Sequence, residues 1–443
     1  MSLLRNLFRA IKHTLIRYPE VEASGLHPST VLFLIRTTAD FDHMLPIAYK
    51  CRINCAEKEV LFVCMDAEFN FRNTHMFRYL DSELNCRCVY IEELIENQSF
   101  FHRCFFAITN WLRSYTFRES HNEKLQRLFL WMNNSAFKNL LYDPRYYSFA
   151  LKKLNVNTIF IDSVRTRSHR FEYYKILPAA WKLSIRVVLM VHTAPSMKEV
   201  VEPIAGVEHD NQVRYSWVDT ILVPSSGHKD FWVSAKTPEN MVHVVGNTRY
   251  SEEWLEIWGD YCGNNKNKES TQNNKINVIL IEPPWSKIVE HKYLDLVERL
   301  LNIPYLNLRV LPHPRAKEMY FLTDKHPGII EPTSTPSSRM VQWCDVAISE
   351  YSSLAWECLE RNKFVLVSNF ITNRQPPRTS IFEAALANSF NDADSMIDSI
   401  SVGYEAGFPM PQENAAYQRL RKEIIYGGRS QCDVLSRYLE YIN

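Results

Sequence analysis

Serine and glutamate side chains gather in residues 349–357, where an apolar stretch gives way to helical spacing. Ser352 and Ser353 would stand at the start of that helix, where unpaired backbone N–H groups and the positive end of the helix dipole favour a phosphate. Glu357 lies one helical turn further on and could bind the two hydroxyls of a ribose. Serines that merely cap an ordinary helix account for the same residues, and both interpretations remain open at this point.

Two further candidates for chemistry follow buried-strand patterns in the first half of the chain. Asp162 follows the apolar run 158–161, and His192 comes immediately after the run 186–191 and before a proline turn. A histidine has a free pKa near neutral pH, so His192 is a candidate general base. The alternative is a structural role, which most single histidines have.

The first apolar run, 31–36, is followed by acidic and histidine side chains. Loops after the carboxyl ends of parallel strands hold ligands in α/β proteins, so Asp40, Asp42 and His43 are candidate acceptor contacts. Asp42 could instead cap the apolar helix that we expect to begin at Met44.

The second half of the chain contains three polar turns, 282–287, 312–315 and 349–353, each after an apolar strand pattern. Parallel strands end at one edge of a sheet, so the three turns should meet there. Together they supply basic and hydroxyl side chains suited to a diphosphate: Lys287, His313, Arg315, Ser352 and Ser353.

Length and composition restrict the class of protein. The 443 residues are 46% hydrophobic, which is enough for two domains with separate cores. A net charge of +1, from 51 basic and 50 acidic residues, provides no overall field for nucleic acid. The ten cysteines form no Cys-x-x-Cys pair, and the Asp-x-Asp sequences at 40–42 and 392–394 are weak metal signals. Neither a zinc site nor a disulfide framework is expected.

Strand and helix patterns alternate on both sides of a polar, Asn- and Lys-rich stretch at 260–275. The expected strands before it are 31–36, 60–64, 88–91, 158–162, 186–191 and 220–225, and those after it are 277–281, 307–311, 329–330, 345–349 and 363–367. This alternation predicts an α/β protein with two doubly wound, Rossmann-like domains and an interdomain cleft. The sequence contains neither a Gly-x-Gly-x-x-Gly motif nor a Walker motif, which argues against a dinucleotide-dependent oxidoreductase and a P-loop enzyme. We expect an N-terminal domain at 1–250, a linker at 251–275, a C-terminal domain at 276–410, and helices at 411–443 that pack back on the first domain.

Residues 1–18 predict a basic amphipathic helix, with leucine, isoleucine and phenylalanine on one face and arginine and lysine on the other. Such a helix could lie on the anionic inner leaflet of a membrane or dock on its own domain. No apolar run approaches the roughly 20 residues of a membrane span, and no signal peptide is recognised. The sequence therefore predicts a cytoplasmic protein, with peripheral contact to the inner membrane as an open alternative.

Six short motifs occur in the order found in one group of transferases. The segment Ile348-Ser-Glu-Tyr-Ser-Ser-Leu-Ala-Trp-Glu357 resembles the Ile-Thr-Asp-Tyr-Ser-Ser-x-x-x-Asp signature of the CDP-glycerol glycerophosphotransferases and related surface-polysaccharide glycosyltransferases. His192-Thr-Ala-Pro195 with Lys198 is similar to their His-Gly-Thr-Pro-x-x-Lys, and Pro312-His313-Pro314 to their His-Pro. The His-Pro and Ser-Ser pairs are also similar to those of bacterial sialyltransferases and capsule Kdo transferases, which use CMP-sugars. The other matches are Asp219 to Ser225, Gly246-Asn-Thr-Arg249, and Ile279 to Trp285.

The resemblance implies a GT-B architecture, with the acceptor on the N-terminal domain and a cytidine-linked donor on the C-terminal one. It would make His192 the general base toward the acceptor hydroxyl, with Lys198 among the acceptor contacts. Helix N-termini and basic side chains would stabilise the leaving group, so no cofactor or metal would be required. The donor would be bound by Trp285, Lys287, His313, Arg315, Ser352, Ser353 and Glu357.

Three positions depart from the family pattern. Thr193 replaces the glycine after the histidine, Glu350 replaces the aspartate before the tyrosine, and the basic residue expected after the tryptophan is displaced to Lys287. These departures bear on the transferred group more than on the fold or the phosphate site. Glu350 joins His192 as a catalytic candidate, and Asp162 would matter if the enzyme retains configuration through a covalent intermediate.

The sequence thus predicts a glycosyltransferase of bacterial surface-polysaccharide synthesis, such as that of capsule, O-antigen or a teichoic-acid-like polymer. It would move a sugar from a nucleotide donor to a glycan or lipid-linked acceptor. A CDP-glycerol or CDP-polyol phosphotransferase is one alternative, and a non-catalytic carbohydrate-binding or scaffold protein is another. No nucleic-acid partner is expected.

Overall fold

The chain forms two compact units. Unit 1 comprises Met1–Val191, Val213–Ile221 and Tyr438–Asn443, and unit 2 comprises His192–Gln212 and Leu222–Arg437. The computed structural model describes residues 28–65, 69–94, 144–162, 170–191, 217–234, 236–263, 275–283, 288–313, 325–332, 335–350, 352–373, 388–429 and 433–442, together with Leu322.

The first sheet has seven strands in the order β3-β2-β1-β4-β5-β6-β7, and the pairs from β3 to β5 are parallel. Every residue of β1, in the middle of the sheet, is buried, and five of its six residues are apolar, as expected for a strand that is covered on both faces. The boundary between the units falls within β6, after Ile221. The elements as far as β6 are β1 (Thr30–Ile35), α2 (Thr38–Asn54), β2 (Glu59–Cys64), η1 (Phe71–Asn73), α3 (His75–Ser82), β3 (Arg87–Tyr90), η2 (Ile91–Leu94), α7 (Pro144–Lys153), β4 (Val156–Asp162), α8 (Arg170–Lys182), β5 (Arg186–Met190) and β6 (Thr220–Val223).

The second sheet, entirely within unit 2, has five strands in the order β12-β11-β10-β8-β9, all parallel. The elements after β6 are α11 (Ser226–Ser234), η4 (Glu239–Met241), β7 (Val242–Val244), α12 (Glu252–Gly263), β8 (Ile276–Ile281), α13 (Glu290–Leu301), β9 (Leu306–Leu311), η6 (Pro327–Ile329), α15 (Ser337–Trp343), β10 (Val346–Ser349), α16 (Leu354–Glu360), β11 (Phe364–Ser368), β12 (Ser389–Phe390), α18 (Ala393–Ala406), η7 (Pro411–Glu413), α19 (Ala415–Ile424) and α20 (Val434–Leu439).

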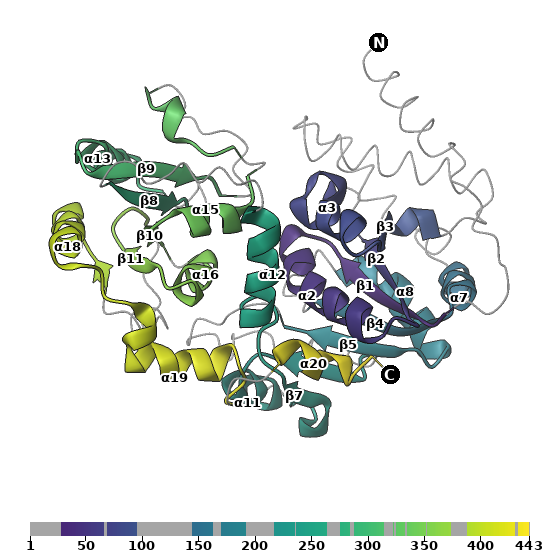
Figure 1. Cartoon of the computed structure of the whole chain (residues 1–443). Helices are drawn as coiled ribbons and strands as arrows, with labels where there is room; N and C mark the ends of the chain where they lie inside the picture. Colours follow the sequence, from purple (N-terminus) through teal and green to yellow (C-terminus); the bar gives the residue numbers. More distant parts are fainter. Residues whose placement is uncertain are drawn as a thin grey trace, which may run out of the picture. The chain divides into compact units, whose positions relative to one another are not determined.

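Helices cover both faces of the five-stranded sheet. Figure 1 shows α13 and α18 on one face and α15 and α16 on the other. On the first face, alternate strand residues such as Val278, Leu280, Val346 and Ile348 pack against Tyr293 and other residues of α13 in one apolar core. This period of two defines which strand side chains share that face.

The predicted α/β fold with two doubly wound, Rossmann-like sheets is confirmed. Ten strand patterns in the sequence correspond to β1–β6 and β8–β11, with ends within about two residues. The two-residue strand β12 was not predicted, and the expected strand at 329–330 was wrong. Pro327–Ile329 instead form a 3-10 turn, after which Ile330 makes an isolated bridge to Val310.

The predicted start of the helix after β1 was also wrong. Helix α2 begins at Thr38 rather than Met44, and Thr37 is its N-cap. The Thr37 hydroxyl accepts a hydrogen bond from the backbone N–H of Asp40 at 3.4 Å and donates to the Asp40 carboxylate at 3.1 Å. A threonine with an acid three residues later satisfies the exposed N–H groups of a helix start, so Asp42 lies inside the helix and does not cap it.

The predicted domain ranges differ from the two compact units. Residues 252–263, within the predicted linker, form helix α12 of unit 2, and unit 2 already begins again at Leu222. The last residues of the chain return to unit 1. There the carbonyl of Ile442 accepts hydrogen bonds from Lys58 Nζ at 2.9 Å and from Thr158 Oγ1 at 3.1 Å.

Gly246, two residues after β7, has a backbone conformation that few other residue types adopt. Its φ is +95°, and a Cβ atom there would overlap the backbone oxygen of Ile425. The same oxygen accepts a hydrogen bond from the N–H of Asn247 at 2.8 Å, which fixes its position. Within unit 2, the absence of a side chain at Gly246 therefore lets these two chain segments approach closely.

None of the helices in the described parts of the chain is both long enough and apolar enough to cross a membrane. The predicted amphipathic helix at 1–18 lies outside the described residues.

Candidate functional site

The three polar turns predicted in the second half begin at one edge of the five-stranded sheet. Strand β8 pairs in parallel with both β9 and β10, with Ile281 opposite Leu311 and Ser349. The next residues along these strands are Glu282, Pro312 and Glu350, so the three turns leave the sheet side by side. The prediction that the three turns meet at one edge of the sheet is therefore confirmed.

Strands β8 and β10 are neighbours, but their connections go to opposite faces of the sheet. β8 leads to α13 on one face, and β10 leads to α16 on the other (Figure 1). Such a point, where the chain turns away in both directions, leaves a crevice at the carboxyl ends of the strands, and α/β proteins bind ligands there. The candidate site of unit 2 is this crevice.

The two serines of the turn after β10 have different roles. Ser353 is the N-cap position of α16, but its side chain makes no capping hydrogen bond. The Ser352 hydroxyl accepts a bond from the backbone N–H of Leu354 at 3.3 Å, and the Ser353 carbonyl accepts one from the Tyr250 hydroxyl at 2.9 Å. Ser353 is exposed, so its hydroxyl is accessible at the edge of the sheet.

Glu357, the predicted ribose contact, is buried in α16. It is 2% exposed and accepts a hydrogen bond from Arg361 Nε at 3.4 Å, one helical turn on. Glu350, the catalytic candidate after β10, is 4% exposed and accepts a bond from the Thr372 hydroxyl at 2.7 Å. Both carboxylates thus have protein partners in the described structure.

Glu282 is a second buried glutamate at this edge, and the sequence did not single it out. It is 2% exposed, and the Tyr293 hydroxyl of α13 donates a hydrogen bond to its Oε1 at 2.6 Å. Loss of hydration on burial raises the pKa of Glu282 to about 7, although the bonds from Tyr293 and from the backbone N–H of His313 oppose that shift. A glutamate placed directly after an apolar strand was the available signal.

We expect the free energy of unfolding to fall as the pH rises from 5 to 8 because of Glu282. Its folded pKa of about 7 lies above the ordinary glutamate pKa of 4.5, so the folded state holds the proton more tightly than the unfolded state does. The stabilisation is complete below the unfolded pKa and is lost as the pH passes through the folded pKa. Measured by urea unfolding, the free energy of unfolding of the wild type should fall by about 2–3 kcal/mol more between these pH values than that of Glu282→Gln. Parallel pH curves for the two proteins would contradict the assignment.

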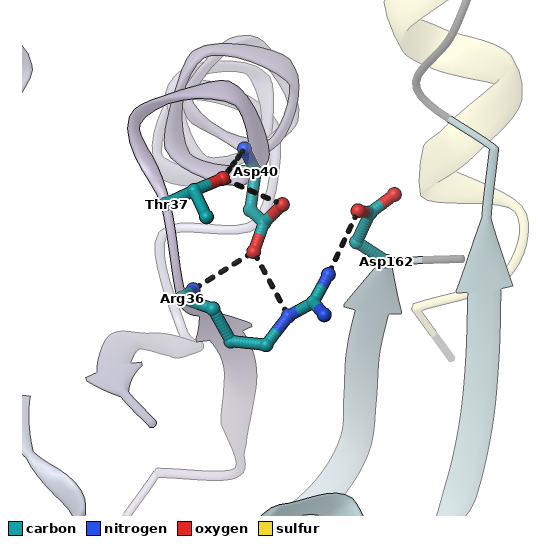
Figure 2. A network of polar contacts seen from close by, with 4 residues as sticks. All are labelled: Arg36, Thr37, Asp40 and Asp162. Carbon is teal, nitrogen blue, oxygen red and sulfur yellow. Dashed lines mark hydrogen bonds and ion pairs between the residues drawn. The ribbon is translucent and has the colours of Figure 1, made fainter. Parts of the chain in front are cut away.

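In unit 1, the carboxyl ends of β1 and β4 carry a buried ion-pair network (Figure 2). Arg36 donates to Asp40 Oδ2 through its backbone N–H at 2.8 Å and through Nε at 3.2 Å. Its Nη2 donates to Asp162 Oδ2 at 3.1 Å. Arg36, Asp40 and Asp162 are 5%, 1% and 1% exposed.

This network determines where three predicted residues lie. Asp162, a catalytic candidate, is held at the carboxyl end of β4 by Arg36. Asp40, predicted to contact the acceptor, is buried and binds Arg36 and Thr37 instead of facing solvent. His43 is buried in α2 and Asp42 is half-buried there. Arg36 itself was missed, although a charged residue at the end of a fully apolar strand signals a buried partner.

Five predicted site residues lie outside the described residues: His192, Lys198, Trp285, Lys287 and Arg315. His313 is described and half-buried at the end of β9. Among the described residues, no group of three or more His, Cys, Asp or Glu side chains is arranged to hold a metal ion.

Comparison with protein-family models and with curated proteins gives no significant match. Solved structures do match over nearly the whole chain. UDP-GlcNAc 2-epimerase from Neisseria meningitidis, bound to UDP-GlcNAc, is 13% identical with a TM-score of 0.55 and covers 93% of this chain and 98% of its own. MnaA from Staphylococcus aureus, bound to UDP, is 12% identical with a TM-score of 0.53 and coverages of 94% and 96%. UDP-GlcNAc 2-epimerase from Methanocaldococcus jannaschii is 10% identical with a TM-score of 0.53 and coverages of 89% and 98%.

These similarities show the fold. The neighbours have two Rossmann-like domains of the GT-B type, and the five- and seven-stranded parallel sheets described above fit the same architecture. The comparisons show a fold of the GT-B type and do not support the CDP-glycerol glycerophosphotransferase family that the motifs resemble. The chain therefore has the two-domain, Rossmann-like GT-B fold.

Proposed function

We propose that this protein is a glycosyltransferase of surface-polysaccharide synthesis that binds a nucleotide-linked sugar at the carboxyl edge of its five-stranded sheet. The observation that carries the proposal is the adjacency of β9, β8 and β10, which gathers the His313, Glu282 and Ser352–Ser353 turns at a topological switch point. The solved structures of similar fold include complexes with UDP-GlcNAc and UDP, which supports a nucleotide-sugar ligand.

Within this proposal, the donor phosphates bind His313, Ser352 and Ser353, and the donor is predicted to be a cytidine nucleotide. His192 takes the proton from an acceptor hydroxyl on a glycan or lipid-linked acceptor, and Asp162 and Glu350 are further catalytic candidates. Trp285, Lys287 and Arg315 complete the donor site. Asp42, His43 and Lys198 are proposed to contact the acceptor, and residues 1–18 to touch the inner membrane. The chemistry proposed here uses no metal.

The donor site is tested by calorimetry of CMP, CDP, CDP-glycerol, UDP, UDP-GlcNAc and GDP against the full-length protein. We expect the protein to bind cytidine nucleotides selectively. Ser353→Ala combined with His313→Ala should weaken that binding by about tenfold or more, because bonds to a charged phosphate are lost. The matched control is Ser401→Ala. Ser401 bonds Tyr305 just before β9, at the opposite edge of the sheet, and its loss should leave affinity unchanged.

Each outcome of this screen has a definite meaning. Selectivity for UDP would keep the site and reject the cytidine donor. Unchanged affinity in the double variant would reject the site, and no binding by any nucleotide would favour the non-catalytic carbohydrate-binding or scaffold protein.

Transfer itself is tested by His192→Ala with the donor that the screen identifies. Loss of the general base should lower the turnover rate by roughly 10²-fold or more while nucleotide affinity is retained. Phosphorus in the product would identify the polyol-phosphate transferase instead of the glycosyltransferase. A turnover rate equal to that of the wild type would rule out His192 as the base.

A further inference from the structure

A row of buried polar side chains crosses three neighbouring strands at the edge of the five-stranded sheet. Val367 pairs with Ser349, which pairs with Ile281, so the residues that follow them, Ser368, Glu350 and Glu282, stand in one row. Their exposed fractions are 0%, 4% and 2%. Because side chains alternate along a strand, this row continues the face on which Leu280 and Ile348 pack against α13.

Two atoms of this row have no hydrogen-bond partner among the described residues. They are Glu282 Oε2 and Ser368 Oγ. The other oxygen of Glu282 receives the Tyr293 hydroxyl at 2.6 Å, so the carboxyl group is fixed from the α13 side. Buried polar atoms in folded proteins are nearly always hydrogen-bonded, so such atoms beside a topological switch point indicate a place where a ligand group binds.

We propose that Glu282 binds a phosphate of the nucleotide donor as a neutral carboxylic acid, so that donor binding takes up a proton. This inference rests on the proposed function, because it assumes that a nucleotide occupies this edge of the sheet. A carboxylate would repel the phosphate, whereas the protonated group can donate a hydrogen bond from Oε2 to a phosphate oxygen. The proton comes from solvent and stays on the carboxyl group, and no covalent bond to the ligand forms.

The surroundings of Glu282 favour the neutral form. Burial raises its pKa to about 7, and a bound phosphate would raise it further because it adds negative charge nearby. The titratable groups on the packed elements are Tyr293 of α13, Glu350 after β10 and His313 after β9; the segment after β11 contributes Thr372, which does not titrate. An ionised Glu350 would also raise the pKa of Glu282, because it adds negative charge nearby. A protonated His313 would lower the pKa of Glu282, because it adds positive charge nearby.

The test is calorimetry with CDP-glycerol and UDP-GlcNAc, whose diesterified phosphates do not titrate between pH 6 and 8. For the wild type, titration at pH 8 in two buffers of different ionisation enthalpy should show uptake of close to one proton for each bound nucleotide. Affinity at pH 8 should be about tenfold weaker than at pH 6. Glu282→Gln keeps a group of similar shape that can donate a hydrogen bond, so it should bind with no proton uptake by this group and lose the pH dependence.

Two variants separate Glu282 from its neighbours. His313→Gln should weaken binding and still take up the proton, whereas loss of uptake in that variant would assign the proton to His313. Tyr293→Phe removes a bond that lowers the pKa of Glu282, so the midpoint of the pH dependence should move upward. This second variant keeps the test decisive if Glu282→Gln does not fold.

The remaining outcomes distinguish this inference from the function on which it rests. Nucleotide binding without proton uptake, or with the same uptake in Glu282→Gln, overturns the role of Glu282 and leaves the donor site standing. If neither these two compounds nor any other nucleotide of the screen binds the folded wild-type protein, both the inference and the proposed function fail.

Discussion

Replacing Arg36 by methionine is expected to lower the free energy of unfolding by about 3–5 kcal/mol. Arg36 forms ion pairs with both Asp40 and Asp162, and all three side chains are buried. Methionine keeps much of the apolar volume but leaves two carboxylates in unit 1 without the guanidinium. Loss of one partner from a buried pair is costly because the remaining charge has neither water nor a counter-ion.

Urea unfolding of three further variants separates charge from packing. Arg36→Met combined with Asp40→Asn and Asp162→Asn removes the stranded charges and should recover a large part of the loss. The matched surface control is Arg299→Met, whose partners Asp295 and Asp394 are exposed, and little change is expected there because water screens such pairs. An effect of Arg36→Met as small as that of Arg299→Met would show that the network does not stabilise unit 1.

The second large effect is expected for Gly246→Ala. Two costs combine there: a φ of +95° that disfavours any Cβ atom, and overlap of that atom with the Ile425 backbone oxygen. The oxygen cannot move away without weakening its hydrogen bond to the N–H of Asn247. Gly246→Ala should therefore lower the free energy of unfolding by about 3 kcal/mol or more.

Gly407 provides the matched control for the backbone cost alone. It ends α18 with a φ of +88°, and a Cβ atom there would have nothing within 4 Å. Gly407→Ala should cost about 1–3 kcal/mol from conformation, and the excess in Gly246→Ala measures the steric overlap. Equal losses for the two variants in thermal or urea unfolding would contradict the close approach at Ile425.

The strands were predictable because the information lies within each run of residues. Stretches such as 31–35 and 278–281 are continuously apolar and β-branched, which is typical of strands buried on both faces. Parallel pairing also follows from the alternation with helices, and it correctly predicts that the turns after β8, β9 and β10 share one edge. Two adjacent isoleucines at 329–330 carry too little pattern to separate a strand from a short turn beside one.

The side-chain partners in the candidate sites were not predictable from local patterns. Arg36 and Asp162 are 126 residues apart, and their contact depends on β1 lying beside β4. The row that contains Glu282 depends on the register of three strands, since a shift of one residue would turn its side chain to the other face. Asp40 differs, because its partner Arg36 lies only four residues earlier, at the end of an apolar strand, and this local signal was missed.

The return of Tyr438–Asn443 to unit 1 affects the order in which contacts can form during synthesis. Residues 222–437, nearly all of unit 2, are synthesised before the segment whose Ile442 carbonyl accepts hydrogen bonds from Lys58 and Thr158. The usual expectation for a two-domain protein is that the N-terminal domain folds first, as it emerges. Here the Ile442 carbonyl reaches Lys58 and Thr158 of unit 1 only after residues 222–437 of unit 2 have been translated, so this contact forms later than the N-terminal position of unit 1 would suggest.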